Sequence, residues 1–271
     1  MGTGRTLIRG VDLAWESTGN GGRPLIWAHG LHSSRADESQ FGFVDWSALP
    51  DDVDVFRYDA RGHGESGGTA DPSASSWDNM ARDQLGLATS LGIDSYVAGG
   101  ASLGAATALH AAVLEPERVR KLVLVIPPTG WETRAAQADF YESVAQLVEA
   151  EGVQPVVDGA ANLPVPDPFA GSDDWLQRRV DALLSADPVR IVNRFRGATT
   201  ANLPSREAVR GIDAPTLILA WTGDPSHPIS SSEELLELLP SATLHVASTM
   251  QDLEAWTDAV AGFVSQSTAE T

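Results

Sequence analysis

A serine between two glycines is the feature of this sequence best suited to covalent chemistry. Residues 100–104 read Gly-Ala-Ser-Leu-Gly, and an apolar run over 95–101 leads directly into Ser102. From Leu103 onward the chain carries apolar residues at helical spacing. A strand, a sharp turn and a helix form the context in which a G-x-S-x-G motif presents a nucleophilic serine. The alternative is a chance pair of glycines around a helix-capping serine. We predict that Ser102 is a nucleophile.

The composition limits what else the chain can do. With no cysteine, it has no thiolate nucleophile, disulfide or thiolate zinc site. Its formal charge of −19 repels phosphate backbones and anionic lipid surfaces, so neither nucleic acid nor membrane is expected as a partner. The N-terminal residues lack the apolar stretch of a signal peptide, and we expect a soluble protein of the cytoplasm. The sequence leaves the oligomeric state open.

The elements around Ser102 follow a strand and helix rhythm. Six short apolar runs are predicted as strands, namely residues 24–29, 53–59, 95–101, 121–126, 216–221 and 243–247. Residues 76–91 and 103–114 show helical spacing between them, and residues 6–16 alternate as an edge hairpin does. Strands that alternate with helices wind a mostly parallel sheet. The predicted fold class is therefore α/β, with a mostly parallel sheet flanked by helices.

This rhythm stops over residues 127–212, a span too long for an ordinary crossover. Residues 134–151 and 175–185 have the pattern of amphipathic helices, and residues 162–168, with three prolines, are typical of a loop. We expect a helical cap over the carboxyl edge of the sheet. The predicted division is a core of residues 1–128 and 213–271, with a cap of residues 129–212.

No cofactor or metal is expected. Gly62, Gly64 and Gly67 match G-x-G-x-x-G after a strand, but the residues that follow continue as a loop, whereas the dinucleotide fingerprint opens a helix. His29 and His32 are three residues apart, but no third ligand accompanies them.

Taken together, these segments resemble the α/β-hydrolase family over nearly the whole chain, and most closely its small esterases, enol-lactonases and haloperoxidase-like hydrolases with a helical cap. Residues 27–32, Trp-Ala-His-Gly-Leu-His, are similar to the family's His-Gly segment. The resemblance implies an oxyanion hole formed by the backbone amides of Leu31 and Leu103. Residues 59–67 look like the family's loop after the fourth strand.

The resemblance also implies a catalytic carboxylate. Residues 222–228, Thr-Gly-Asp-Pro-Ser-His-Pro, follow a predicted strand and are similar to the family's acid loop, which makes Asp224 the candidate. An Asp-Pro turn without catalytic function is the alternative.

The family's usual histidine is missing from its place after the last strand. Met250, Gln251 or Asp252 stands there, and Thr249 with Asp252 fits a helix capping box. Among the six histidines, His227 is the best substitute because it lies three residues beyond Asp224. A polar loop residue with no catalytic role is an equally valid interpretation, and the sequence leaves both open.

The other histidines are less suitable as a base. His63, His110 and His245 lie on elements that point to structural roles, and His29 is expected to shape its loop. His32 could line a substrate pocket together with Trp131 and Tyr141.

The function predicted first is hydrolysis of a small ester, lactone or related carboxyl derivative, through a Ser102 acyl-enzyme that water resolves. The base would be His227 and the acid Asp224. The alternative is a degenerate relative that binds a small molecule or a partner without turnover, or that performs non-hydrolytic chemistry in the same pocket. The partner expected in the first case is a small-molecule substrate.

Overall fold

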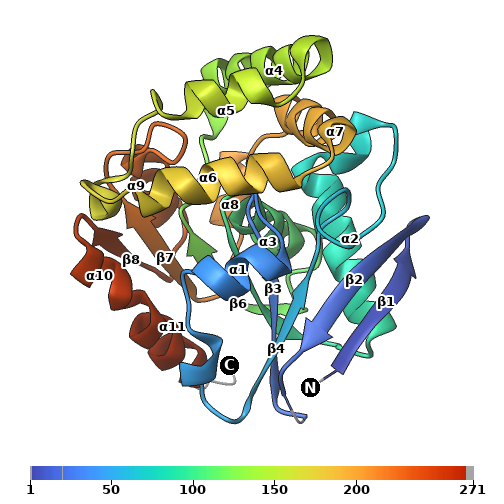
Figure 1. Ribbon diagram of the computed structural model, residues 1–271. Coiled ribbons are helices and arrows are strands. Elements are labelled where there is room, and N and C mark those ends of the chain that lie inside the picture. Colours follow the sequence, from blue (N-terminus) through green and yellow to red (C-terminus); the bar gives the residue numbers. More distant parts are fainter. Residues whose placement is uncertain (1, 20, 267–271) are drawn as a thin grey trace.

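The computed structural model describes residues 2–19 and 21–266 (Figure 1). Its strands form one eight-stranded sheet in the order β1-β2-β4-β3-β5-β6-β7-β8. Their bounds are β1 Gly2–Ile8, β2 Val11–Ser17, β3 Arg23–Ala28, β4 Val53–Tyr58, β5 Tyr96–Ala101, β6 Val119–Val125, β7 Thr216–Trp221 and β8 Ala242–Ala247. β1 and β2 form the predicted edge hairpin, β2 is antiparallel to β4, and all remaining pairs are parallel. The predicted mostly parallel sheet is confirmed.

Helices lie on both faces of this sheet. The α-helices are α1 Arg35–Phe41, α2 Trp77–Ser90, α3 Leu103–Leu114, α4 Arg134–Glu151, α5 Gln154–Ala160, α6 Asp174–Ser185, α7 Pro188–Thr199, α8 Arg206–Arg210, α9 Ile229–Leu238, α10 Met250–Glu254 and α11 Trp256–Ser265. Short 3-10 helices are η1 Trp46–Ala48, η2 Pro72–Ser75, η3 Trp131–Thr133 and η4 Asp167–Phe169. None of the helices in the described ranges is both long and apolar enough to cross a membrane.

Alternation along the central strands creates a core on each face. In β3, Ile26 and Ala28 face a core shared with α2, α3 and α9, whereas Leu25 and Trp27 face a second core shared with η1 and α11. Successive side chains of a strand point to opposite faces, so a strand covered on both sides must be apolar throughout. The central strands are apolar in this way, which is why they were recognisable in the sequence.

Helices α4 to α7 fall between β6 and β7 and lie together at one end of the molecule, at the top of Figure 1. We call residues 129–212 the helical segment. Its partition from the core as a separate cap domain stays a prediction. Three of its α-helices differ from expectation: α5, α7 and α8 were not predicted from the sequence. The side chain of Asp187 caps α7, and Pro188 occupies its first turn, as at many helix N-termini.

Candidate active site

Ser102 lies in a strained turn between β5 and α3. Its backbone angles are φ 53° and ψ −110°, a region that residues with a side chain rarely occupy. Neighbouring backbone crowds this turn: a Cβ on Gly104 would stand 1.9 Å from the Ala28 carbonyl oxygen, and one on Gly100 would stand 2.5 Å from it. Only glycine fits at these two positions, which explains the motif in physical terms. Strain of this kind is typical of functional turns.

A histidine reaches the serine hydroxyl. His227 Nε2 lies 2.8 Å from Ser102 Oγ, and His227 Nδ1 lies 2.7 Å from Asp224 Oδ2. An ionised carboxylate can only accept hydrogen bonds, so Nδ1 carries the proton and Nε2 is left to accept the hydroxyl proton of Ser102. The structure thus brings together the three residues that the sequence suggested as nucleophile, base and acid.

Asp224 is held as a carboxylate by its surroundings. It accepts the backbone N–H of Ser226 at 2.8 Å and the indole N–H of Trp221 at 3.2 Å. Burial by itself would raise the pKa of Asp224, but the charge and hydrogen bond of His227, the Ser226 amide and the charge of Arg179 together hold the pKa below its ordinary value. The carboxylate can therefore orient His227 and stabilise its protonated form.

A tight turn makes this pairing possible within one loop. The His227 backbone N–H donates to the Asp224 carbonyl at 3.2 Å, and this turn lets the His227 ring contact both the Asp224 carboxylate and Ser102. After β8, by contrast, Thr249 and Asp252 form the expected capping box of α10, and Asp252 accepts the backbone N–H groups of Ser248 and Thr249. Asp252 has a sufficient structural role there.

Three of the other histidines, His29, His63 and His110, hold parts of the scaffold together. His29 Nε2 accepts the backbone N–H of Ala60, and buried His63 bonds the carbonyl of Leu31 through Nε2. Burial lowers the pKa of both rings, so both stay neutral. His110 hydrogen bonds a backbone carbonyl of the helical segment.

The two amides predicted for an oxyanion hole are available. Within the described ranges, neither the Leu31 nor the Leu103 backbone N–H donates a hydrogen bond to another protein group. Leu103 is the first residue of α3, where the helix supplies no acceptor for its N–H. The N-terminal end of a helix also favours negative charge. This end of α3 is therefore suited to an oxyanion, and the role of both amides stays a proposal.

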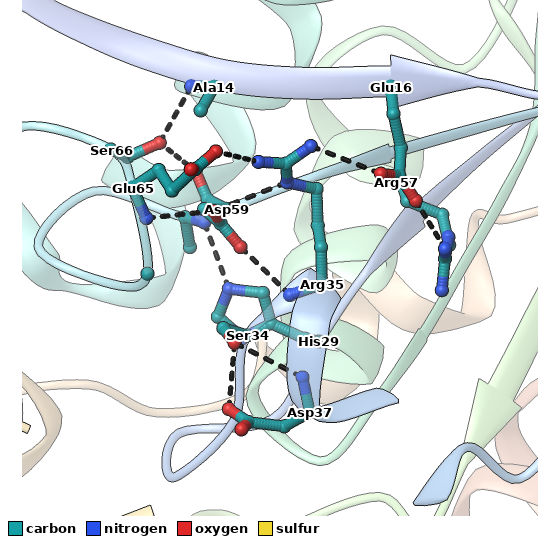
Figure 2. Close-up of polar contacts among 12 residues, drawn as sticks. Ala14, Glu16, His29, Ser34, Arg35, Asp37, Arg57, Asp59, Glu65 and Ser66 are labelled. Atoms are coloured by element: carbon teal, nitrogen blue, oxygen red, sulfur yellow. Dashed lines mark hydrogen bonds and ion pairs between the residues drawn. The ribbon is translucent and has the colours of Figure 1, made fainter. Parts of the chain in front are cut away.

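A buried network fixes the loop beside Leu31 (Figure 2). The Asp59 carboxylate accepts the backbone N–H of Arg35 at 2.8 Å and that of Glu65 at 2.9 Å. Ser66 Oγ donates to the Asp59 carbonyl at 2.6 Å and accepts the Ala14 N–H at 2.8 Å. These contacts join the segments at 29–35 and 59–66 into one rigid support.

His32 and Tyr141 are joined through an aromatic contact. The ring of Phe195 lies 5.0 Å from His32 and 5.4 Å from Tyr141. His32 keeps an accessible surface, yet the surrounding protein desolvates it and, with the positive charges of Arg179 and Arg194, lowers its pKa to about 3. Its role in substrate binding stays a proposal.

Trp131 lies in different surroundings. Its indole N–H donates to the Pro204 carbonyl at 2.9 Å, and the Arg206 guanidinium lies 4.7 Å from its ring centre. Among residues 2–19 and 21–266, no ring contact or hydrogen bond joins Trp131 to Ser102 or His227. Its role in binding substrate stays a prediction.

Sequence reasoning missed the indole that supports the acid. Trp221 is fully buried at the end of β7, and besides bonding Asp224 its ring packs at 5.2 Å against Trp175 of α6. A tryptophan three residues before the acid was a usable signal, because a buried indole N–H needs an acceptor.

Comparisons with known proteins agree with this architecture. A family model described as the alpha/beta hydrolase fold matches residues 23–252. "3-Oxoadipate enol-lactonase 1" of Acinetobacter baylyi is 27% identical over 194 residues, which cover 69% of this chain and 67% of that protein.

Solved structures show the same fold at low identity. The enol-lactonase from Burkholderia xenovorans LB400 superposes with a TM-score of 0.82 at 20% identity, covering 97% of this chain and 100% of that one. A thermophilic esterase from Thermogutta terrifontis gives a TM-score of 0.77 at 24% identity, covering 97% and 98%. Because the family model spans most of the chain and the sheet has the matching architecture, this protein belongs to the α/β-hydrolase fold family.

Proposed function

We propose that this protein hydrolyses a small ester, lactone or related carboxyl derivative through an acyl-enzyme on Ser102. The observation that carries the proposal is the 2.8 Å contact between His227 Nε2 and Ser102 Oγ, with Asp224 on the other ring nitrogen. Similarity to an enol-lactonase supports a hydrolase role.

In the proposed reaction, His227 alternates between base and acid, first while the acyl-enzyme forms and again while water cleaves it. His227 takes the hydroxyl proton as Ser102 Oγ bonds to the carbonyl carbon, and Asp224 stabilises the imidazolium that results. The oxyanion would be stabilised by the amides of Leu31 and Leu103. His227 then gives its proton to the leaving oxygen, the C–O bond breaks, and an acyl-enzyme remains. Water, deprotonated by His227, attacks the carbonyl carbon of this ester. The bond from that carbon to Ser102 Oγ then breaks, Oγ takes the proton back from His227, and the carboxylic acid is released.

The alternative of an inactive relative was motivated by the missing histidine after the last strand. That argument is weaker because His227, which comes from the loop after β7, lies at hydrogen-bond distance from Ser102 and can serve as the base. The substrate-binding roles of His32, Trp131 and Tyr141 belong to this proposal. So do a small-molecule substrate, a cytoplasmic location and independence of nucleic acid and membrane.

Steady-state hydrolysis of 4-nitrophenyl butyrate by the purified chain tests the proposal. Wild type is expected to release 4-nitrophenolate, and Ser102→Ala to lose at least about a thousandfold of kcat. Wild-type turnover that survives Ser102→Ala would overturn the nucleophile assignment. If the wild-type protein is inactive and also fails to react with a fluorophosphonate, the hydrolase proposal is overturned.

A further inference from the structure

Helix α6 turns an arginine toward the protein interior. Trp175, Arg179 and Leu183 are spaced four residues apart, so they lie on one face of this helix. Trp175 stacks on Phe169 at 4.8 Å, and Leu183 is buried. Since apolar contacts on both sides of Arg179 face inward, the arginine shares that inward face.

This face of α6 rests against the turn that carries the base and the acid. The Trp175 ring meets the Trp221 ring at 5.2 Å, and the Trp221 indole donates to Asp224. Trp221 also lies 6.1 Å, centre to centre, from the His227 ring. Arg179 stands one helical turn beyond Trp175 and therefore lies beside this group.

Electrostatic effects agree with that placement. Desolvation is the largest influence on His32 and lowers its pKa, and the positive charge of Arg179 is the next largest. The same charge helps to lower the pKa of Asp224. The charge of Arg179 therefore lowers the pKa of two residues near Ser102. One is His32, next to the predicted oxyanion hole, and the other is Asp224, in the acid turn.

The guanidinium of Arg179 lies near the Asp224 carboxylate without bonding to it. Over residues 2–19 and 21–266, no hydrogen bond or ion pair involves its side chain, although acidic residues outnumber basic ones by 37 to 18. Other arginines, such as Arg35 and Arg206, pair with carboxylates. Burial lowers the pKa of Arg179, and the charge of Asp224 offsets only part of this effect. A half-buried guanidinium that makes no hydrogen bond is costly, and its planar fork fits a carboxylate in two hydrogen bonds.

A second arginine adds positive charge from the neighbouring helix. Arg194 of α7 donates from Nε to the Gly62 carbonyl at 2.9 Å, and the next residue, Phe195, packs on His32. Burial, followed by the charge of Arg190, lowers the pKa of Arg194 to about 10. The charge of Arg194 also contributes to the lowered pKa of His32. His32 is therefore exposed to the positive charges of Arg179 on α6 and Arg194 on α7, although the protein as a whole is acidic.

We propose that the substrate carries a free carboxylate and that Arg179 binds it while the scissile carbonyl lies at Ser102. The inference rests on the proposed hydrolase function. It narrows the substrate class to carboxylated compounds, such as a half-ester of a dicarboxylic acid or a lactone that bears a carboxylate.

Two esters that differ only in this charge test the inference. They are mono-4-nitrophenyl adipate, with a free carboxylate, and its methyl ester, which is neutral. Wild type is expected to show a kcat/KM for the anionic ester at least about tenfold above that for the neutral one, as a charge-assisted hydrogen bond can provide. In Arg179→Met this ratio should fall toward one, mainly through a higher KM, and Arg179→Lys should retain part of it.

The adjacent arginine supplies a matched control. Arg178 lies with its guanidinium 5.8 Å from the Phe169 ring centre, on a different side of α6, so Arg178→Met should preserve the ratio. Thermal melts of all variants check folding. A wild type that cleaves both esters without preference, or an Arg179→Met variant that keeps the preference, would overturn this inference and leave the hydrolase proposal intact.

A binding measurement tests the proposed carboxylate site independently of turnover. If wild type cleaves neither ester, the hydrolase proposal fails, and calorimetric titration with monomethyl adipate still decides the role of Arg179. Binding that weakens at least about tenfold in Arg179→Met supports the carboxylate site. Equal binding by both proteins, or none by either, overturns it.

Discussion

His227 and Asp224 are three residues apart in one turn, and the 2.7 Å bond between His227 Nδ1 and Asp224 Oδ2 aims the other ring nitrogen at Ser102. Acid and base therefore come from the same loop after β7. The short connection fixes their relative position through the backbone turn as well as through the side-chain bond. The segment after β8 is left free to begin α10 with a capping box.

Asp224→Asn should reduce kcat by about a thousandfold to ten-thousandfold, because an amide at this position no longer enforces the His227 tautomer or stabilises the imidazolium. The measurement is steady-state ester hydrolysis, with circular dichroism to check the fold. A loss below tenfold would mean that Asp224 only shapes the turn.

The turn at Ser102 should be intolerant of added volume. Gly104→Ala places a Cβ 1.9 Å from the Ala28 carbonyl oxygen, so we expect the free energy of unfolding to fall by roughly 3 kcal/mol or more. Gly262→Ala is the control: no atom lies within 4 Å of its new Cβ, and in the exposed interior of α11 it should stabilise by about 0.5–1 kcal/mol. Urea denaturation measures both. Equal stability of the two variants would contradict the crowded turn.

The strand, turn and helix around Ser102 could be predicted because each strand covered on both faces must be apolar and because crowding at Gly100 and Gly104 allows only glycine. The base could be named from the sequence but not separated from a loop histidine without a catalytic role. The turn that folds His227 back onto Asp224 decides its side-chain direction, and the sequence did not show that turn. Spacing within a loop does not report side-chain direction.

The helical segment was harder to predict than the core. Helix α7 was missed although the signal was present, because Asp187 and Pro188 form a typical helix start and the buried residues Ile191 and Phe195 have helical spacing. Tertiary packing of these residues stabilises the helix. Arg179 carried a usable signal: an arginine stands between Trp175 and Leu183 on the inward face of α6. Periodicity alone marks that face as core, and the arginine departs from the pattern.

Glu38 should make stability depend on pH. Burial raises its pKa from 4.5 to about 8, although the Trp27 indole donates to its carboxyl at 2.6 Å. Folded protein therefore holds this proton more tightly than unfolded protein. The stabilisation is fully present below about pH 4.5 and is lost as the pH rises through about 8.

Glu38→Gln keeps an oxygen for Trp27 but cannot ionise, so its free energy of unfolding should fall less than that of wild type between these pH values, by a difference on the order of 4 kcal/mol. Denaturant melts across this range measure the difference, with Glu237→Gln on an exposed site of α9 as the control. Parallel curves for wild type and Glu38→Gln would show that the carboxyl does not stay protonated.

The rate at which a fluorophosphonate labels Ser102 tests the central claim most directly, since it reports activation of the hydroxyl without needing the natural substrate. Intact-mass measurements over time should show one adduct on wild type, none on Ser102→Ala, and labelling slowed at least about a hundredfold in His227→Gln. His110→Gln, a change of the same kind at a histidine that bonds only a backbone carbonyl, should label at the wild-type rate. Labelling of His227→Gln as fast as wild type, or an adduct on Ser102→Ala, would contradict activation of Ser102 by His227.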